Sequence, residues 1–153
     1  MCLLDESAKL LPDASFVMIG PLAKVSEQDL AKGQNIHYLG MKDYSVLPNY
    51  LKRFNIAMMP FAMNEATKYI SPTKTLEYMA AYKPIISTPV YDVVRDYSHC
   101  VHIVSTSLDF CKAVQKISLY NNNHKLASEY NTVLEKTSWD NTVEKMTEII
   151  NQN

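Results

Sequence analysis

Long hydrophobic runs, clusters of one charge and paired cysteines are all missing from this chain of 153 residues. No apolar run approaches the roughly 20 residues that a membrane-spanning helix needs, so we expect any lipid contact to be peripheral. The formal net charge is −1 and no run of Lys and Arg occurs, which argues against a nucleic-acid partner. Asp5, Glu6 and Lys9 interrupt what would have to be the apolar core of a signal peptide.

The three cysteines, Cys2, Cys100 and Cys111, are odd in number and show no paired spacing. They predict neither a disulfide framework nor a zinc site, and a reducing cytoplasm suits them best. The segment His99-Cys100-x-His102 invites a metal interpretation. Neighbouring residues of a strand point to opposite faces and no second cluster supplies ligands, so we expect no metal and no cofactor.

What the sequence does contain is an ordinary globular composition, with 47% hydrophobic and 20% charged residues. Its length predicts one domain over residues 1–153. Short apolar runs alternate with amphipathic stretches, which indicates an α/β fold with a doubly wound, Rossmann-like parallel sheet. The predicted strands are Phe16–Gly20, Ile36–Leu39, Ile56–Pro60, Ile85–Thr88 and Val101–Val104. The predicted helices are Gln28–Lys32, Val46–Phe54, Pro72–Tyr82, Leu108–Tyr120, His124–Lys136 and Trp139–Asn151.

Two of these helices carry apolar stripes at helical spacing, which predict faces turned toward the core. One stripe is Leu47, Tyr50, Leu51 and Phe54, and the other is Trp139, Val143, Met146, Ile149 and Ile150. The segment Tyr91–Asp96 is interpreted as a polar loop and helix opening after a strand, and we expect mainly a solvated loop.

The head of the chain departs from a complete doubly wound sheet. Met1–Leu11 reads as the back end of an amphipathic helix that leads directly into the first predicted strand. In such a sheet the first strand normally lies in the middle, with later strands on both sides of it. We therefore expect a vacant or repaired place between Phe16–Gly20 and Ile56–Pro60, and a chain that is part of a longer protein.

The segment Ser71–Thr88 predicts an anion-binding helix start that leads into a buried strand. Ser71 is a good N-cap, and Pro72 suits the first helical position because its missing N–H costs nothing there. The amides of Thr73, Lys74 and Thr75 would then face outward. A helix N-terminus carries about half a positive charge, so a diphosphate can bind there beside the ammonium group of Lys74.

Glu77 lies one turn further along, close to the face of Lys74. Its carboxylate can accept hydrogen bonds from vicinal hydroxyls such as those of a ribose or a sugar. Leu76, Met79 and Ala80 are expected to turn toward the sheet. The alternative is a capped surface helix with a solvated Lys/Glu pair, and these residues alone leave both interpretations open.

The order of these motifs closely resembles the C-terminal, donor-binding half of GT-B glycosyltransferases, of the family 4 type common in bacterial capsule and cell-wall polysaccharide synthesis. The resemblance covers roughly residues 10 to 150. It rests on Pro12–Pro21, Asn35–Gly40, Leu47–Leu51, Met59–Phe61, the pattern Ser71-Pro72-x-Lys74-x-x-Glu77-Tyr78-x-Ala80, and Ser138–Asp140.

The resemblance implies a role for each matching position. The helix start cradles the diphosphate, Glu77 holds the ribose hydroxyls, the turn after Ile36–Leu39 contacts the base, and the loop Phe61–Ile70 faces the donor sugar. Gly20 ends a strand at the ligand-binding edge, although a tight turn before Pro21 explains it equally well. The implied donor-binding residues are Gly20, Gly40, Met41, Lys42, Asn64, Thr67, Ser71, Pro72, Thr73, Lys74, Thr75 and Glu77, with Lys74 and Glu77 also catalytic.

Two positions depart from the family pattern. Many members carry a second glutamate eight residues before the one that matches Glu77, and here Tyr69 stands in that place. Asn64, Glu65 or Thr67 replaces that contact, or the sugar hydroxyls are bound differently. The helix usually ends at a glycine suited to a left-handed C-cap, and here the residue is Tyr82.

The resemblance implies a retaining, metal-independent transferase that moves a sugar from a nucleotide diphosphate sugar to an acceptor hydroxyl. The acceptor would be a saccharide or lipid-linked saccharide, and an N-terminal GT-B domain would supply the remaining catalytic groups. We therefore expect no transfer by these residues alone, and a cytoplasmic location, in some cases at the inner membrane face. The alternatives are a sugar-nucleotide epimerase of the same fold and a non-catalytic nucleotide-binding module.

Overall fold

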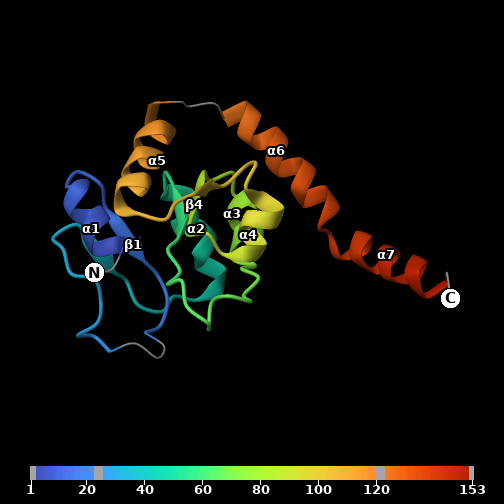
Figure 1. Ribbon diagram of the computed structural model, residues 1–153, viewed down its shortest axis with the longest axis horizontal. Coiled ribbons are helices and arrows are strands. Elements are labelled where there is room, and N and C mark those ends of the chain that lie inside the picture. The colour runs from blue at the N-terminus through green and yellow to red at the C-terminus, as the bar shows by residue number, and fades with distance from the viewer. Residues whose placement is uncertain (1–2, 23–25, 120–122, 152–153) are drawn as a thin grey trace.

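The computed structural model describes residues 3–22, 26–119 and 123–151, and within them the chain forms the predicted α/β fold (Figure 1). All the described strands pair in parallel. They are β1 (Phe16–Met18), β2 (Ile36–Tyr38), β3 (Ala57–Met59), β4 (Ile85–Ser87) and β5 (His102–Ile103). Each one falls inside a predicted strand, and each is one or two residues shorter.

Helices precede, separate and follow the strands. They are α1 (Leu3–Leu10), the 3-10 turn η1 (Tyr44–Val46), α2 (Leu47–Arg53), α3 (Lys74–Ala80), α4 (Tyr91–Tyr97), α5 (Ser107–Leu119), α6 (Asn123–Lys136) and α7 (Trp139–Asn151). The predicted helix Gln28–Lys32 is wrong, since only turns and bends occur there. Five residues are too few to offset the cost of nucleating a helix without a packed face.

The strands are divided into two groups. β1 pairs with β2, and β4 lies between β3 and β5, while β1 and β3 share no ladder. Residues 3–10 form α1, so no described residue ahead of β1 supplies a strand between them. The sheet is interrupted at the predicted place.

α1 and α5 cover one face and join the two groups of strands. Phe16 of β1 and Phe110 of α5 pack with ring centroids 5.9 Å apart. Both belong to a buried cluster that also contains Ile36 of β2 and Ile86 of β4. Asn35 adds a polar link, because its side-chain amide donates to the carbonyl oxygens that end α1, at Ala8, Leu11 and Ala14, over 2.9–3.1 Å.

The opposite face is covered by α3, α4 and α6. Met79 of α3, Val93 of α4 and Tyr130 of α6 are each 0% exposed and lie in one cluster with β3 and β4. The hydroxyl of Tyr130 donates to the carbonyl of Lys83 over 3.1 Å, which satisfies the polar end of a buried ring. This cluster fixes α3, and with it the predicted phosphate helix.

α7 extends away from the sheet at the far end of the chain (Figure 1). Its stripe residues Val143, Met146, Ile149 and Ile150 are 57–72% exposed, so the prediction that they face the core is wrong. The side chain of Trp139 lies outside the described residues. Helical spacing identifies an apolar face, but it does not say whether the chain itself offers a surface to cover that face.

Candidate functional site

The helix of the predicted phosphate site begins two residues later than expected. α3 starts at Lys74, and Thr73, in the capping position, has helical backbone angles and makes no side-chain capping bond. The amide of Thr75 donates to the carbonyl of Pro72 over 3.1 Å, so the preceding turn is tight and the amide of Thr75 is already bonded. Among the described residues, the amides of Thr73 and Lys74 have no acceptor.

Lys74 and Glu77 form an ion pair on the exposed side of α3. The Lys74 Nζ lies 2.9 Å from Glu77 Oε1 and 2.8 Å from Oε2. The two side chains are 48% and 39% exposed. This hydrogen bond raises the pKa of Lys74 despite an opposing effect of burial, so the ammonium group stays charged at neutral pH. The site thus presents a cation and a carboxylate that both remain accessible.

The inner side of α3 packs on the sheet. Thr75 is 0% exposed and its hydroxyl lies 3.5 Å from the sulfur of Met59, so this side chain is part of the core. Leu76 and Met79 also pack into the core, as predicted. Ala80 is exposed, and its predicted orientation toward the sheet is wrong.

Two glycines meet where β1 and β2 end. The amide of Gly20 donates to the carbonyl of Gly40 over 3.0 Å. Their φ angles are +146° and +66°, and a Cβ built on either would meet nothing within 4 Å. The backbone conformation therefore demands glycine at both positions, and the space beside them is open. Met41, the next predicted base contact, is 76% exposed, and Lys42 is half-buried.

Sequence reasoning missed the capped turn that connects this loop with α2. The carboxylate of Asp43 accepts a hydrogen bond from the amide of Ser45 over 2.9 Å and caps η1. Bonds from Ser45 lower the pKa of Asp43. The next residue, Tyr44, is 74% exposed and interacts electrostatically with Lys74. The signal was present in the sequence, since an Asp-x-Ser capping pattern stands just ahead of Leu47-Pro48.

The predicted sugar-facing residues hold their own loop in place. The amide of Asn64 donates to Thr67 Oγ1, and the amide of Thr67 donates to Asn64 Oδ1, both over 3.1 Å. The Thr67 hydroxyl also bonds to the carbonyl of Ala62. These bonds close a compact turn after β3, in the green segment at the lower edge of Figure 1.

The two departures from the family pattern have different outcomes. Tyr69 is 83% exposed, and the ammonium group of Lys68 lies 5.4 Å from its ring centroid. Tyr82 adopts φ = +52°, the left-handed conformation expected of the usual glycine. Its hydroxyl donates to Asn131 Oδ1 over 2.9 Å, which ties this turn to α6.

Comparison with known proteins decides the family. The profile described as "Glycosyl transferases group 1" matches residues 1–119. The chain belongs to the group 1 glycosyltransferases. It is 32% identical, over 89 residues, to a Bacillus subtilis (strain 168) protein described as the teichuronic acid biosynthesis glycosyltransferase TuaH, a match that covers 56% of this chain and 22% of TuaH.

Two solved structures share the fold of this group 1 glycosyltransferase. WaaG, involved in lipopolysaccharide biosynthesis, superposes with a TM-score of 0.60 at 13% identity, over 97% of this chain and 42% of WaaG. HepE from Anabaena, solved with UDP and glucose, gives a TM-score of 0.60 at 15% identity, over 95% of this chain and 43% of HepE. Both are GT-B enzymes, and the predicted fold class is confirmed. The chain thus spans under half the length of these relatives.

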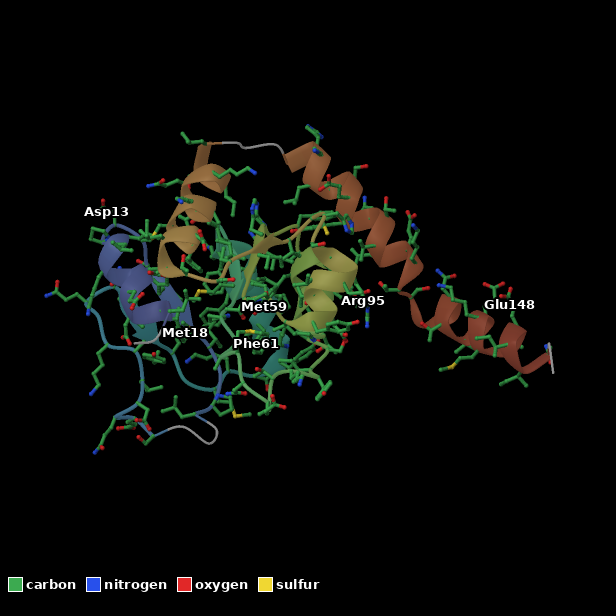
Figure 2. All side chains as sticks on the ribbon, viewed as in Figure 1. Asp13, Met18, Met59, Phe61, Arg95 and Glu148 are labelled. Atoms are coloured by element: carbon green, nitrogen blue, oxygen red, sulfur yellow. The ribbon has the colours of Figure 1, made fainter. Side chains whose placement is uncertain are left out.

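The group 1 glycosyltransferase places its predicted donor residues on the loops that follow β1, β2 and β3 and on the start of α3. Met59 and Phe61 mark the end of β3 in the middle of the molecule (Figure 2). No described helix has both the length and the apolar composition to cross a membrane. A cleft lined by other described residues lies at the amino ends of the strands and contains none of the predicted donor residues.

Proposed function

We propose that this chain is the donor-binding part of a retaining, metal-independent GT-B glycosyltransferase of surface polysaccharide synthesis. The observation that carries the proposal is the accessible Lys74–Glu77 pair at the start of α3, in a chain of this family. HepE was solved with UDP and glucose, which supports a nucleotide-sugar donor for a chain of the same fold.

The proposed chemistry is electrostatic. Negative charge grows on the leaving diphosphate as the sugar departs, and a fixed ammonium group stabilises it better than water because it need not reorganise. The raised pKa of Lys74 keeps that group charged. When Lys74 turns to the diphosphate, Glu77 becomes available to accept hydrogen bonds from the ribose hydroxyls.

The other predicted residues complete the donor site in this proposal. Gly40, Met41 and Lys42 contact the base, Gly20 leaves room at the strand edge, and Asn64 and Thr67 present the loop that faces the sugar. Ser71, Pro72 and Thr73 bring the two available amides toward the diphosphate. Thr75 contributes by fixing α3 on Met59, since its hydroxyl and amide are already engaged.

The acceptor, a saccharide or lipid-linked saccharide, and the remaining catalytic groups belong to an N-terminal GT-B domain in this proposal. The chain spans 22% of TuaH and 42% of WaaG, which supports a partner domain. We place the reaction in the cytoplasm, where nucleotide sugars are made. Residues 1–153 alone are expected to bind the donor without transferring its sugar.

Isothermal titration calorimetry of the chain with UDP and UDP-glucose tests the proposal. Lys74→Ala should weaken UDP binding by about 1.5–3 kcal/mol, because a charge-assisted bond to phosphate is lost. Lys112→Ala, an exposed lysine on α5, is the matched control and should leave affinity unchanged. Unchanged affinity for UDP in the Lys74 variant would favour the alternative interpretation, in which α3 is a surface helix with a solvated Lys/Glu pair. If UDP-glucose binds no more tightly than UDP in the parent chain, a nucleotide-binding module is favoured.

A further inference from the structure

The cleft at the amino ends of the strands lies at the edge of the sheet opposite the proposed donor site. Ile56, Pro84 and Val101 line it, and each of them directly precedes a strand. α5 and α6 form its sides, and the end of α5 and the start of α6 lie at the top of Figure 1. The cleft has a volume of about 1200 Å³, somewhat more than the roughly 300–1,000 Å³ usual for small-molecule sites.

Apolar side chains contribute to the cleft lining from three elements. Phe54 stands at the end of α2, Ile117 on α5 and Leu126 on α6, and all three are half-buried. Such side chains can cover a hydrocarbon group, at about 25 cal/mol for each Å² of apolar surface removed from water.

The charged lining is unbalanced. Lysines and histidines face the cleft from several elements, whereas Glu129 is its only carboxylate among the described lining residues. Glu129 lies 3.8 Å from Lys125 of its own helix. Lys83 donates to the carbonyl of Lys52 over 2.9 Å. These partners leave most of the positive charge in the cleft without an anion.

Lys116 of α5 and His102 of β5 are the two basic residues of the lining on which the proposed site depends. Neither has an ion pair or a hydrogen bond with the described residues. His102 is half-buried, and burial together with the charge of Lys116 lowers its pKa. The lowered pKa leaves the His102 ring neutral at pH 7, so one ring N–H can donate beside the charged ammonium group of Lys116, and an anion can accept from both.

We propose that this cleft binds an amphiphilic phosphate, with Lys116 and His102 contacting the phosphate and the apolar lining residues Phe54, Ile117 and Leu126 covering its alkyl chain. The site goes beyond the proposed function, because it shares no residue with the donor site. A short alkyl phosphate represents the ligand class, and inorganic phosphate and the corresponding alcohol represent its two halves.

Titration of the whole chain with hexyl phosphate, followed by NMR of the His102 ring, tests the inference. Hexyl phosphate should shift this ring saturably, inorganic phosphate should do so with an affinity several-fold weaker, and 1-hexanol should leave the ring resonance in place. Lys116→Gln should weaken hexyl phosphate binding about fivefold, a conservative figure for one charge-assisted bond at an exposed side chain. Lys112→Gln, on the same helix but outside the cleft lining, is the matched control and should bind as the parent does.

Three results would overturn the inference: no saturable His102 shift at millimolar hexyl phosphate, equal affinities for hexyl phosphate and inorganic phosphate, or equal weakening in the Lys116 and Lys112 variants. Lys74→Ala separates the two proposals. This variant should lose most of its UDP binding and keep its hexyl phosphate binding. The two proposals can therefore be disproved independently of each other.

Discussion

At the scale of single residues, the Lys74–Glu77 pair couples the two halves of the proposed donor site. In the structure the two side chains bind each other, since both carboxylate oxygens of Glu77 accept hydrogen bonds from the ammonium group of Lys74. A ligand that binds both must therefore break this pair. Because the pair is substantially exposed, the cost of breaking it is small compared with a charge-assisted bond to phosphate.

Glu77→Gln should reduce discrimination between ribonucleotides and deoxyribonucleotides. The change weakens the acceptor for the ribose hydroxyls by about 0.5–1.5 kcal/mol and leaves the phosphate contacts in place. Calorimetric titration with UDP and deoxy-UDP measures the difference, and Glu144→Gln, at an exposed position of α7, is the control. Equal losses for both nucleotides would contradict the ribose role of Glu77.

Tyr82 stores backbone strain that a glycine would release. A left-handed conformation costs an L-residue roughly 1–2 kcal/mol, and the Tyr82–Asn131 hydrogen bond offsets part of that cost. In an Asn131→Ala background, where this bond is absent, Tyr82→Gly should raise the free energy of unfolding by about 0.5–1 kcal/mol after the entropy of glycine is counted. Urea denaturation of the single and double variants measures this, and a less stable double variant would show that the ring contacts of Tyr82 outweigh the strain.

At the scale of elements, α7 presents an apolar face that the described chain leaves exposed. Met146 on α7 is 60% exposed, whereas Met79 on α3 is 0% exposed. Met146→Gln should change the free energy of unfolding by less than about 0.5 kcal/mol, and Met79→Gln should lower it by about 3 kcal/mol or more. Urea denaturation compares the same substitution in the two settings. A large loss at Met146 would mean that the face of α7 is packed in solution.

The strands were predictable from sequence because short apolar runs bounded by turn residues leave few alternatives. Phe16, Ile36 and Ile85 each begin a predicted and an observed strand. α4 was largely missed because its charged residues Asp92, Arg95 and Asp96 hid a short stripe, in which Val90, Val93 and Tyr97 recur at helical spacing and pack into the core. Most of the stability of this short helix comes from tertiary packing against the cluster around Tyr130 and not from its local sequence.

The candidate site was predictable only in part. The spacing of Lys74 and Glu77 fixed their common face, and the order of motifs gave the family. The start of α3 could not be read from Ser71-Pro72, because Pro72 uses its carbonyl to hold the amide of Thr75 in a tight turn before the helix. The sequence also does not indicate that Asn64 and Thr67 form hydrogen bonds with each other, because these bonds depend on the path of their loop.

At the scale of the whole molecule, the interruption of the sheet leaves β1 and β3 each with one side that no described strand pairs. In a parallel ladder, alternate residues direct their backbone groups to opposite sides. Phe16 donates to the carbonyl of Asn35 on the β2 side, so the backbone groups of Val17 point to the open side of β1. By the same alternation Met58 faces the open side of β3, since Ala57 donates to Pro84 on the β4 side. Unpaired strand edges of this kind are templates for association with another chain.

We therefore expect the chain to self-associate and to melt at a temperature that depends on its concentration. Sedimentation velocity and thermal melts over a range of concentrations measure both. Val17→Pro removes a donor from the open edge and should suppress association while β1 stays paired with β2. Met18→Pro is the matched control, because Met18 faces β2 and its loss should disrupt the β1–β2 ladder itself. A sharp melt that does not change with concentration, from a clean monomer, would contradict the expectation. If Val17→Pro associates as the parent does, the contact runs through another surface, and the exposed face of α7 is the next one to change.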